Sequence, residues 1–239
     1  MLILAVDTSG KQGSIALARA EESAPDTDPN PVDVLEVVSL SGGTFSAQLV
    51  PQIAALLSSH GFTKHDLGGF VVVSGPGSFT GLRIGLAAVK ALGEILNKPI
   101  AAISLLEVLA LRSGFRGRVV SALDAGRSEV YVGEYEIAKD SAEESAHLVS
   151  AKMVQERLLS RDEFISVVRG SNLVTSDEIV SATARNAGIS VSTIEPTDAG
   201  IVAQLGWRKI QKGETVPSEQ LDANYIRRTD AEILAKIST

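Results

Sequence analysis

The hydroxyl side chains of a glycine-rich stretch are the first groups in this sequence that could carry out chemistry, as nucleophiles. The stretch follows the apolar run Val71–Val73 and, after Ser74, consists of Gly75, Pro76, Gly77, Ser78, Phe79 and Thr80. A serine or threonine hydroxyl becomes a nucleophile when a base removes its proton. No histidine and no suitably spaced lysine accompanies these hydroxyls in the sequence. We therefore predict no catalytic residue, and expect Ser78 and Thr80 to cap the following helix by accepting its free N–H groups.

Two acidic turns are candidates for binding a nucleotide and its magnesium ion. Asp7-Thr8-Ser9-Gly10 ends the first apolar run, and Asp124-Ala125-Gly126 ends a similar run later in the chain. These turns resemble the phosphate loops of actin-like ATPases, in which aspartates hold Mg²⁺ through water and backbone N–H groups hold phosphates. The first turn lacks a second glycine close behind its aspartate, and the second half lacks a clear glycine pair for adenosine. The sequence therefore predicts a residual nucleotide site at Asp7, Thr8, Ser9 and Asp124, with an intact ATP site as the alternative.

The histidines do not form a metal-binding pattern. His60 ends a predicted helix, His65 lies in the loop after it, and His147 is far along the sequence. A metal site usually needs several correctly placed ligands and a supporting second layer of hydrogen bonds. The lack of cysteine removes thiolate ligands and disulfides. We therefore expect surface histidines and no metal site in this chain.

The composition is that of an acidic protein with an aliphatic core. Hydrophobic residues make up 44% of the 239 residues and aromatic residues only 4%, so the core must consist of Ala, Val, Ile and Leu. The net charge of −7 argues against nucleic-acid binding by this chain alone, because phosphate binding needs a clustered basic face. No apolar run is long enough to span a bilayer, and the apolar start Met1–Val6 lacks the basic residues of a signal peptide. We therefore expect a cytoplasmic protein without a membrane association.

The first half of the chain predicts the elements that position these turns. The order is three strands, then helix, strand, helix, strand and helix, at Leu2–Val6, Ser14–Ala18, Val34–Leu40, Ser46–His60, Phe70–Ser74, Leu82–Asn97, Ile100–Ile103 and Leu105–Arg112. The stretch Glu21–Pro31 is rich in proline and acids and is expected to be an exposed loop. This order is ribonuclease-H-like, and it gives a mixed sheet with helices on both faces.

The second half predicts a smaller version of the same plan. Its strands are expected at Val119–Asp124, Val130–Tyr135, Leu148–Lys152 and Phe164–Val168, and its helices at Ser176–Ala187 and Ala199–Lys212. The fold class is therefore α/β, with two ribonuclease-H-like lobes whose mixed sheets are flanked by helices. We expect an N-terminal lobe over residues 1–113 and a smaller, degenerate C-terminal lobe with a terminal tail over residues 114–239.

Several motifs resemble the TsaB (YeaZ) family, in the family's order and over nearly the whole chain. They are ILAVDTSG, SAQLVPQIAALL, SGPGSFTGLRIGLAAVKAL, ISLLEVLA, LDAGRSEVY and the late NYIRR. The resemblance implies a fold of the actin-like ATPase (ASKHA) superfamily. It also implies a noncatalytic subunit of the bacterial system that makes threonylcarbamoyladenosine in tRNA. Phe45 and Gly126 depart from the family pattern, which often has histidine and arginine at these positions.

The same resemblance implies the partners. The family is paralogous to TsaD, which binds a metal and a nucleotide and transfers a threonylcarbamoyl group to the adenosine beside the anticodon. We expect this chain to bind a TsaD-like catalytic subunit, to be joined by a TsaE-like ATPase, and to form a homodimer when alone. We expect contact with tRNA only through that complex, and ATP and a metal ion on the partner subunits rather than a cofactor here. The alternatives are a small-molecule kinase or ATPase of the same fold, or a glycoprotease-like peptidase.

Two helices are expected to carry the partner surface. The helix Leu82–Asn97 is apolar around most of its circumference, and small residues on it allow another helix to approach closely. The resemblance implies pairing through this helix and Ser46–His60. The expected interface residues are Leu49, Ile53, Leu56, Gly81, Arg83, Ile84, Gly85, Ala88 and Leu92. The terminal Asn224–Arg228 is expected to dock across the lobes.

Overall fold

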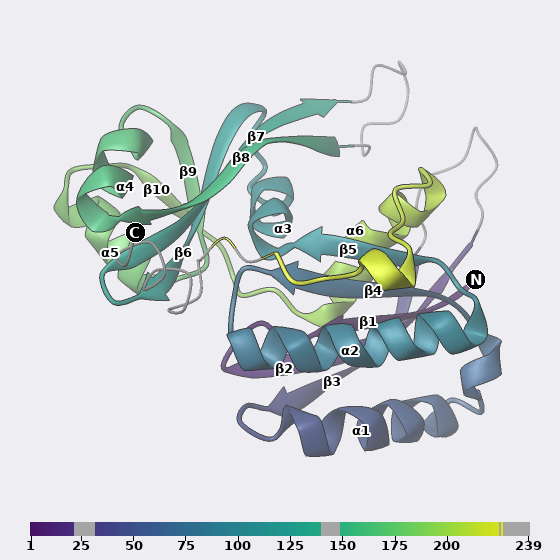
Figure 1. Ribbon diagram of the computed structural model, residues 1–239. Coiled ribbons are helices and arrows are strands. Elements are labelled where there is room, and N and C mark those ends of the chain that lie inside the picture. The colour runs from purple at the N-terminus through teal and green to yellow at the C-terminus, as the bar shows by residue number, and fades with distance from the viewer. Residues whose placement is uncertain (22–31, 140–148, 225, 227–239) are drawn as a thin grey trace, which may run out of the picture.

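The computed structural model describes residues 1–21, 32–139, 149–224 and 226, and it contains two five-stranded sheets (Figure 1). The predicted loop Glu21–Pro31 beyond its first residue, His147, and most of Asn224–Arg228 lie outside the described residues. In the described part of the chain, no helix is both long and apolar enough to cross a membrane.

The first sheet has the predicted ribonuclease-H-like topology. Its strands are β1 (Leu2–Asp7), β2 (Gln12–Ala20), β3 (Val32–Ser41), β4 (Leu67–Gly75) and β5 (Ile100–Ser104), in the order β3-β2-β1-β4-β5. β1 pairs with β2, and β2 with β3, in antiparallel fashion, whereas β4 pairs in parallel with both β1 and β5. This arrangement confirms the predicted mixed sheet.

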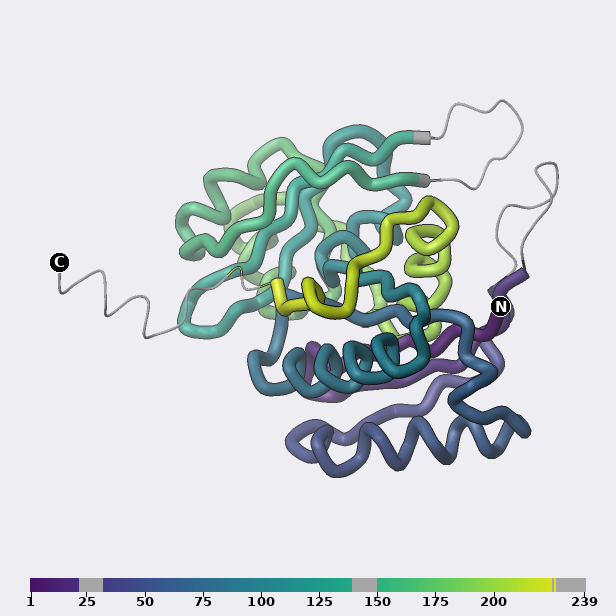
Figure 2. Tube along the Cα trace, turned by 45° about the vertical axis from the view of Figure 1, so that its right-hand side comes forward, coloured from purple at the N-terminus to yellow at the C-terminus, as the bar shows by residue number. Residues whose placement is uncertain are grey.

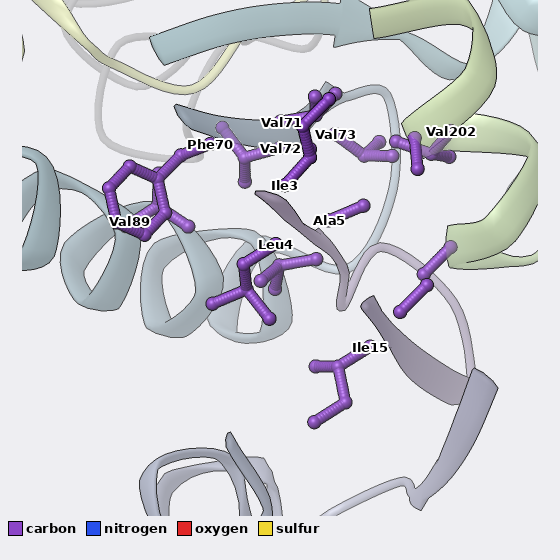
Figure 3. Packing of buried hydrophobic residues seen from close by; sticks show 14 of the residues in the cluster. Ile3, Leu4, Ala5, Ile15, Phe70, Val71, Val72, Val73, Val89 and Val202 are labelled. Carbon is purple, nitrogen blue, oxygen red and sulfur yellow. The ribbon is translucent and has the colours of Figure 1, made fainter. Parts of the chain in front are cut away.

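Helices cover both faces of this sheet, so its central strands are apolar on both sides. The helices are α1 (Phe45–Ser59), α2 (Phe79–Leu96) and α6 (Ala199–Gln211). Figure 3 shows Leu4 and Phe70 directed toward Val89 of α2, while Val73 is directed toward Val202 of α6. Successive side chains along β1 and β4 therefore point to opposite faces of the sheet and pack in two apolar layers, one on each face.

The second sheet repeats the plan of the first. Its strands are β6 (Gly117–Gly126), β7 (Glu129–Lys139), β8 (Val149–Ser160), β9 (Asn172–Thr175) and β10 (Val191–Thr193), in the order β10-β9-β6-β7-β8. β6 pairs with β7 and β7 with β8 antiparallel, and β9 pairs in parallel with β6 and β10. Read from β8, this is the order of the first sheet, so both halves are ribonuclease-H-like.

One predicted strand in the second half is wrong. The segment Phe164–Val168 belongs to the helix α4 (Arg161–Val168), which begins at a capping box between Ser160 and Glu163. Phe164 and Val168 are four residues apart, so both fall on the buried face of one helix. The other helices of this half are α5 (Glu178–Asn186) and α6, as predicted, whereas the short strands β9 and β10 were not predicted.

Two helices pack at least partly outside the half of the chain to which their position in the sequence assigns them. Ala203 and Trp207 of α6 are buried with the first sheet, so residues 199–211 join the core of the first lobe although they follow the second in sequence. The helix α3 (Leu105–Arg112) lies between the sheets (Figure 1), with Val108 in the first core and Leu109 in a cluster with β6 and β7. The division of the chain at residue 113 therefore does not divide its hydrophobic core, and the domain boundary stays a prediction.

Candidate functional site

A cleft of about 1270 Å³ lies between the two lobes. The first lobe contributes Ser9, Gly10 and Lys11 of the turn after β1, together with the glycine-rich loop from Pro76 onward. The second lobe contributes Asp124, Ala125, Arg127, Asp177 and Ile179. Both acidic turns therefore reach the same cleft, as the two-lobed plan predicts.

The glycine-rich loop packs directly on the turn that follows β1. The N–H of Ser78 donates to the carbonyl of Ser9 at 2.7 Å, and the Thr8 hydroxyl donates to the carbonyl of Gly81 at 2.8 Å. A Cβ at Gly77 would lie 2.4 Å from the Ser9 carbonyl oxygen, and one at Gly81 would lie 2.1 Å from that of Thr8. These glycines therefore permit close contact between two loops of this chain.

Two of the three hydroxyls of this region, those of Ser74 and Ser78, have structural partners. Ser78 is the N-cap of α2 and accepts from the N–H of Gly81, which confirms its predicted role. The cap predicted for Thr80 is wrong, because α2 begins at Phe79 and Thr80 lies exposed in its first turn. Ser74 donates to the carbonyl of Ile103 at 3.3 Å, between the adjacent strands β4 and β5.

The carboxylate of Asp7 is held within its own turn. It accepts from the N–H of Ser9 at 2.9 Å and from the Ser9 hydroxyl at 2.6 Å, and the residue is 6% exposed. Of the four residues predicted for a nucleotide, Ser9 and Asp124 line the cleft, whereas Asp7 and Thr8 are absent from its lining in the described part of the chain. Asp124 accepts from the N–H of Gly126 at 3.1 Å. A residual nucleotide site stays a prediction, with Ser9 and Asp124 as the two members that line the cleft.

Burial has the largest effect on the pKa of Asp7 and raises it, against the lowering effect of the Ser9 hydrogen bonds. A raised pKa means that the folded protein holds this proton more tightly than the unfolded chain does. The contribution of Asp7 to stability is therefore fullest below the ordinary pKa of 3.8, and it is lost as the pH rises through the folded-state value. Above that value the folded protein carries a buried charge.

Asp7→Asn should therefore stabilise the protein at pH 7 and have little effect near pH 4. The amide oxygen can accept both Ser9 hydrogen bonds without the desolvation cost of a charge. A gain of about 1 kcal/mol corresponds to a melting temperature higher by about 2–4 °C in a chain of this size. Thermal unfolding of both proteins at pH 4 and pH 7 measures the difference. A lower melting temperature for Asp7→Asn at pH 7 would contradict the assignment.

Five of the residues predicted for the partner surface are buried within this chain. The side chains of Leu49, Ile53 and Leu56 on α1 are 1%, 5% and 2% exposed and belong to the first core. Gly81 and Gly85 face Thr8, and a Cβ at Gly85 would lie 2.3 Å from the Thr8 hydroxyl oxygen. The prediction is wrong for these five, because the helix faces that carry them pack against the first sheet and the turn after β1.

The outer face of α1 and α2 is formed by other residues. Of the predicted set, Arg83 is exposed, and Ile84, Ala88 and Leu92 are half-buried. Val50 is 64% exposed, Phe79 44% and Ile95 72%, and none of these three was predicted for the partner surface. Ile84, Ala88 and Ile95 follow a helical spacing, which was the available signal in the sequence. We call Val50, Ile84, Ala88, Leu92 and Ile95 the outer helix face.

The described histidines have no metal-binding arrangement around them. His60 lies 2.9 Å from a carboxylate oxygen of Glu36, and His65 lies in the short 3₁₀ helix over Lys64–Asp66. Within residues 1–21, 32–139, 149–224 and 226, no three His, Cys, Asp or Glu side chains are grouped to hold a metal ion.

Comparisons with known proteins place this geometry in a family. Residues 39–167, more than half of the chain, match the family described as TsaD, tRNA N6-adenosine threonylcarbamoyltransferase. The tRNA threonylcarbamoyladenosine biosynthesis protein TsaB of Bacillus subtilis strain 168 is 36% identical over 137 residues, 57% of this chain and 56% of that one. The chain belongs to the TsaD-related TsaB (YeaZ) family.

Other members of the TsaB (YeaZ) family show the same similarity. TsaB of Escherichia coli K12 is 29% identical over 164 residues, 66% of each chain. The matches thus span between about half and two thirds of these curated relatives. The structure of YeaZ from Pseudomonas aeruginosa has a TM-score of 0.70 at 22% identity, and covers 94% of this chain and 100% of its own, which supports the fold.

The two departures from the TsaB pattern have local structural explanations. Phe45 is 5% exposed and its ring lies 2.9 Å from the position of a Cβ on Gly13, so it fills the core beside the cleft. Gly126 has a φ of 72°, in the left-handed region that favours glycine. Arg127 and Ser128 also have positive φ, at 52° and 64°, which is the geometry of a two-residue type I′ hairpin turn.

Proposed function

We propose that this chain is a noncatalytic scaffold subunit that binds a TsaD-like enzyme and supports threonylcarbamoyl transfer to the adenosine next to the anticodon of tRNA. Membership of the TsaB (YeaZ) family supports the pathway. The exposure of Val50 and Ile95 on the outer helix face is the single observation that supports a binding role.

The outer helix face has the properties of a protein-binding surface. α1 and α2 run side by side along one face of the first sheet (Figure 1), and they contact one another. Val50 and Ile95 are the most exposed large hydrophobic residues of these two helices, and exposed alanines such as Ala54 and Ala91 lie near them in sequence. Large exposed apolar side chains on two neighbouring helices are candidates for an interaction surface. Helices with small residues also allow close approach of a partner helix.

The local hydrogen bonding argues for binding rather than chemistry. Ser78 caps α2, and the Asp7 carboxylate is held by Ser9. A nucleophile needs a free hydroxyl with a base beside it. An aspartate that holds the Mg²⁺ of a nucleotide through water needs to face the ligand. In this proposal ATP and the metal ion belong to the TsaD-like and TsaE-like subunits, tRNA is contacted only through the complex, and the chain acts in the cytoplasm.

Size-exclusion chromatography with light scattering tests the proposal. The chain is mixed with the TsaD-like subunit of the same organism, beside each protein alone. We expect a homodimer of the chain alone and a one-to-one complex in the mixture, with a TsaE-like ATPase joining in the presence of Mg-ATP. Two unchanged peaks under all these conditions would contradict the scaffold role.

A small-molecule kinase or ATPase of the same fold is the second candidate, because the cleft brings Ser9 and Asp124 onto one surface. Isothermal titration of the chain alone with Mg-ATP separates the two functions. We expect no micromolar binding and no turnover. Micromolar affinity that Asp124→Ala removes would favour the ATPase over the scaffold.

A further inference from the structure

The segment that follows α6 crosses from the first lobe to the second. It comprises residues 216–224 and Ile226, which we call the strap, and Figure 2 shows it in yellow between the lobes. Backbone hydrogen bonds fix it to the first lobe, from the N–H of Val216 to the carbonyl of Ile100 at 2.8 Å and from that of Asn224 to Ser74, also at 2.8 Å. Leu221 is 5% exposed and belongs to the first core.

The far end of the strap contacts the second lobe through Glu156 of β8. The side-chain N–H of Asn224 donates to one carboxylate oxygen of Glu156. The other oxygen accepts from the hydroxyl of Ser104, the last residue of β5, and from that of Tyr135 on β7. A single carboxylate therefore joins the first sheet, the second sheet and the strap. A hydrogen bond to a carboxylate is charge-assisted and therefore stronger than one between two neutral groups.

The second lobe is built to hold this carboxylate in place. Tyr135 is 1% exposed, and burial together with the nearby Glu156 raises its pKa, so its hydroxyl keeps its proton and donates. Gly133 pairs with Glu156 across β7 and β8, and a Cβ there would lie 2.6 Å from the Tyr135 ring and 3.0 Å from Leu106 of α3. The close packing of Tyr135 against Gly133 restricts its ring to a position from which the hydroxyl donates to Glu156.

The strap is also part of the cleft wall. Asn224 and Ile226 line the cleft, and Ile226 contacts the apolar cluster between the second sheet and α3. The backbone oxygen of Asn224 lies 3.0 Å from the position of a Cβ on Gly75, which has a φ of 135°. The strap therefore touches the glycine-rich loop on one lobe and Glu156 on the other.

We propose that the strap is a clasp that sets the opening of the interlobe cleft, with the Asn224–Glu156 hydrogen bond as its latch. The chain passes between the lobes from α3 to β6 and again from β10 to α6, and the contacts beside these crossings set the angle between the lobes. The latch is the polar contact from the strap to β8, and Ser104 makes a second contact from the first sheet to the same carboxylate. Loss of the latch therefore weakens the hold on the second sheet beside the glycine-rich loop, while the Ser104 contact remains.

Pulsed electron paramagnetic resonance across the cleft tests the clasp. The chain has no natural cysteine, so nitroxides are attached specifically at Thr80→Cys and Ile179→Cys, exposed cleft residues on the first and second lobes. Asn224→Asp replaces the donor by a carboxylate that repels Glu156. We expect the ratio of open to closed population to rise about tenfold, the effect of losing one hydrogen bond to a charged group. An unchanged distance distribution would overturn the proposal.

A second substitution separates the latch from a general loss of stability. In Asn224→Asp with Glu156→Gln, the glutamine amide can donate to the new aspartate while its oxygen still accepts from Ser104 and Tyr135. We expect this double variant to restore the closed distance. Asn186→Asp, the same substitution at an exposed position at the end of α5, should leave the distance unchanged. Opening by Asn186→Asp, or no recovery in the double variant, would also overturn the proposal.

Discussion

Ile95→Asp should separate this chain from the TsaD-like subunit that we propose as its partner, without unfolding the chain. Ile95 is 72% exposed near the end of α2, so the substitution removes little packing from the folded monomer. In a complex that buries the outer helix face, the same aspartate would be a desolvated and unpaired charge. Loss of an exposed apolar contact with addition of such a charge should weaken Kd by about 100-fold, or ~2.7 kcal/mol.

Calorimetric titration of the TsaD-like subunit with each variant measures this effect. Val50→Asp, 64% exposed on α1, should weaken binding in the same direction, because it lies on the same pair of helices. Met153→Asp is the matched control, since Met153 is 60% exposed but lies on β8 of the second sheet. If Ile95→Asp and Val50→Asp bind normally and Met153→Asp does not bind, the interface lies on the second lobe instead of on the outer helix face.

The first sheet could be predicted because its strands are long, apolar and well separated by turns. β1 and the centre of β4 are buried on both faces, and such runs are visible in the sequence alone. β9 and β10 have four and three residues, too few to establish a period. The helix α4 could have been found from Ser160 and Glu163, whose spacing is that of a capping box. The apolar run Phe164–Val168 outweighed that signal.

The candidate site was harder to predict than the fold. A stripe of small residues on a helix is compatible with a face that packs inside the chain and with a face that binds a partner. A stripe of glycines predicts close approach of a neighbour, but not whether that neighbour is another chain. For Gly81 and Gly85 the neighbour is Thr8, more than seventy residues earlier in the chain. The role of Glu156 was equally hidden, since its partners Ser104, Tyr135 and Asn224 come from three distant segments.

Gly81→Ala gives the clearest test of this packing, because the two interpretations predict opposite signs. Gly81 lies inside α2, and alanine is favoured over glycine in a helix by about 0.8–1 kcal/mol. If the face of α2 that carries Gly81 and Gly85 pointed to a partner or to solvent, Gly81→Ala would therefore raise the melting temperature of the isolated chain. In the structure the new Cβ would lie 2.1 Å from the Thr8 carbonyl oxygen, a backbone atom that cannot rotate away.

Displacement of the turn after β1 should therefore dominate, and it would also stretch the hydrogen bond from the Thr8 hydroxyl to Gly81. Overpacking costs about 1–3 kcal/mol, and the upper end applies here because the clash is with a backbone atom. After the helix-propensity gain of about 1 kcal/mol, a net loss of about 2 kcal/mol lowers the melting temperature by about 4–8 °C in a chain of this size. Ala87→Gly is the reference for helix propensity alone, because Ala87 is exposed on the same helix. Its decrease should be smaller than that of Gly81→Ala in thermal unfolding of the two variants. A rise for Gly81→Ala would show that the glycine-rich loop and the turn after β1 are not packed together.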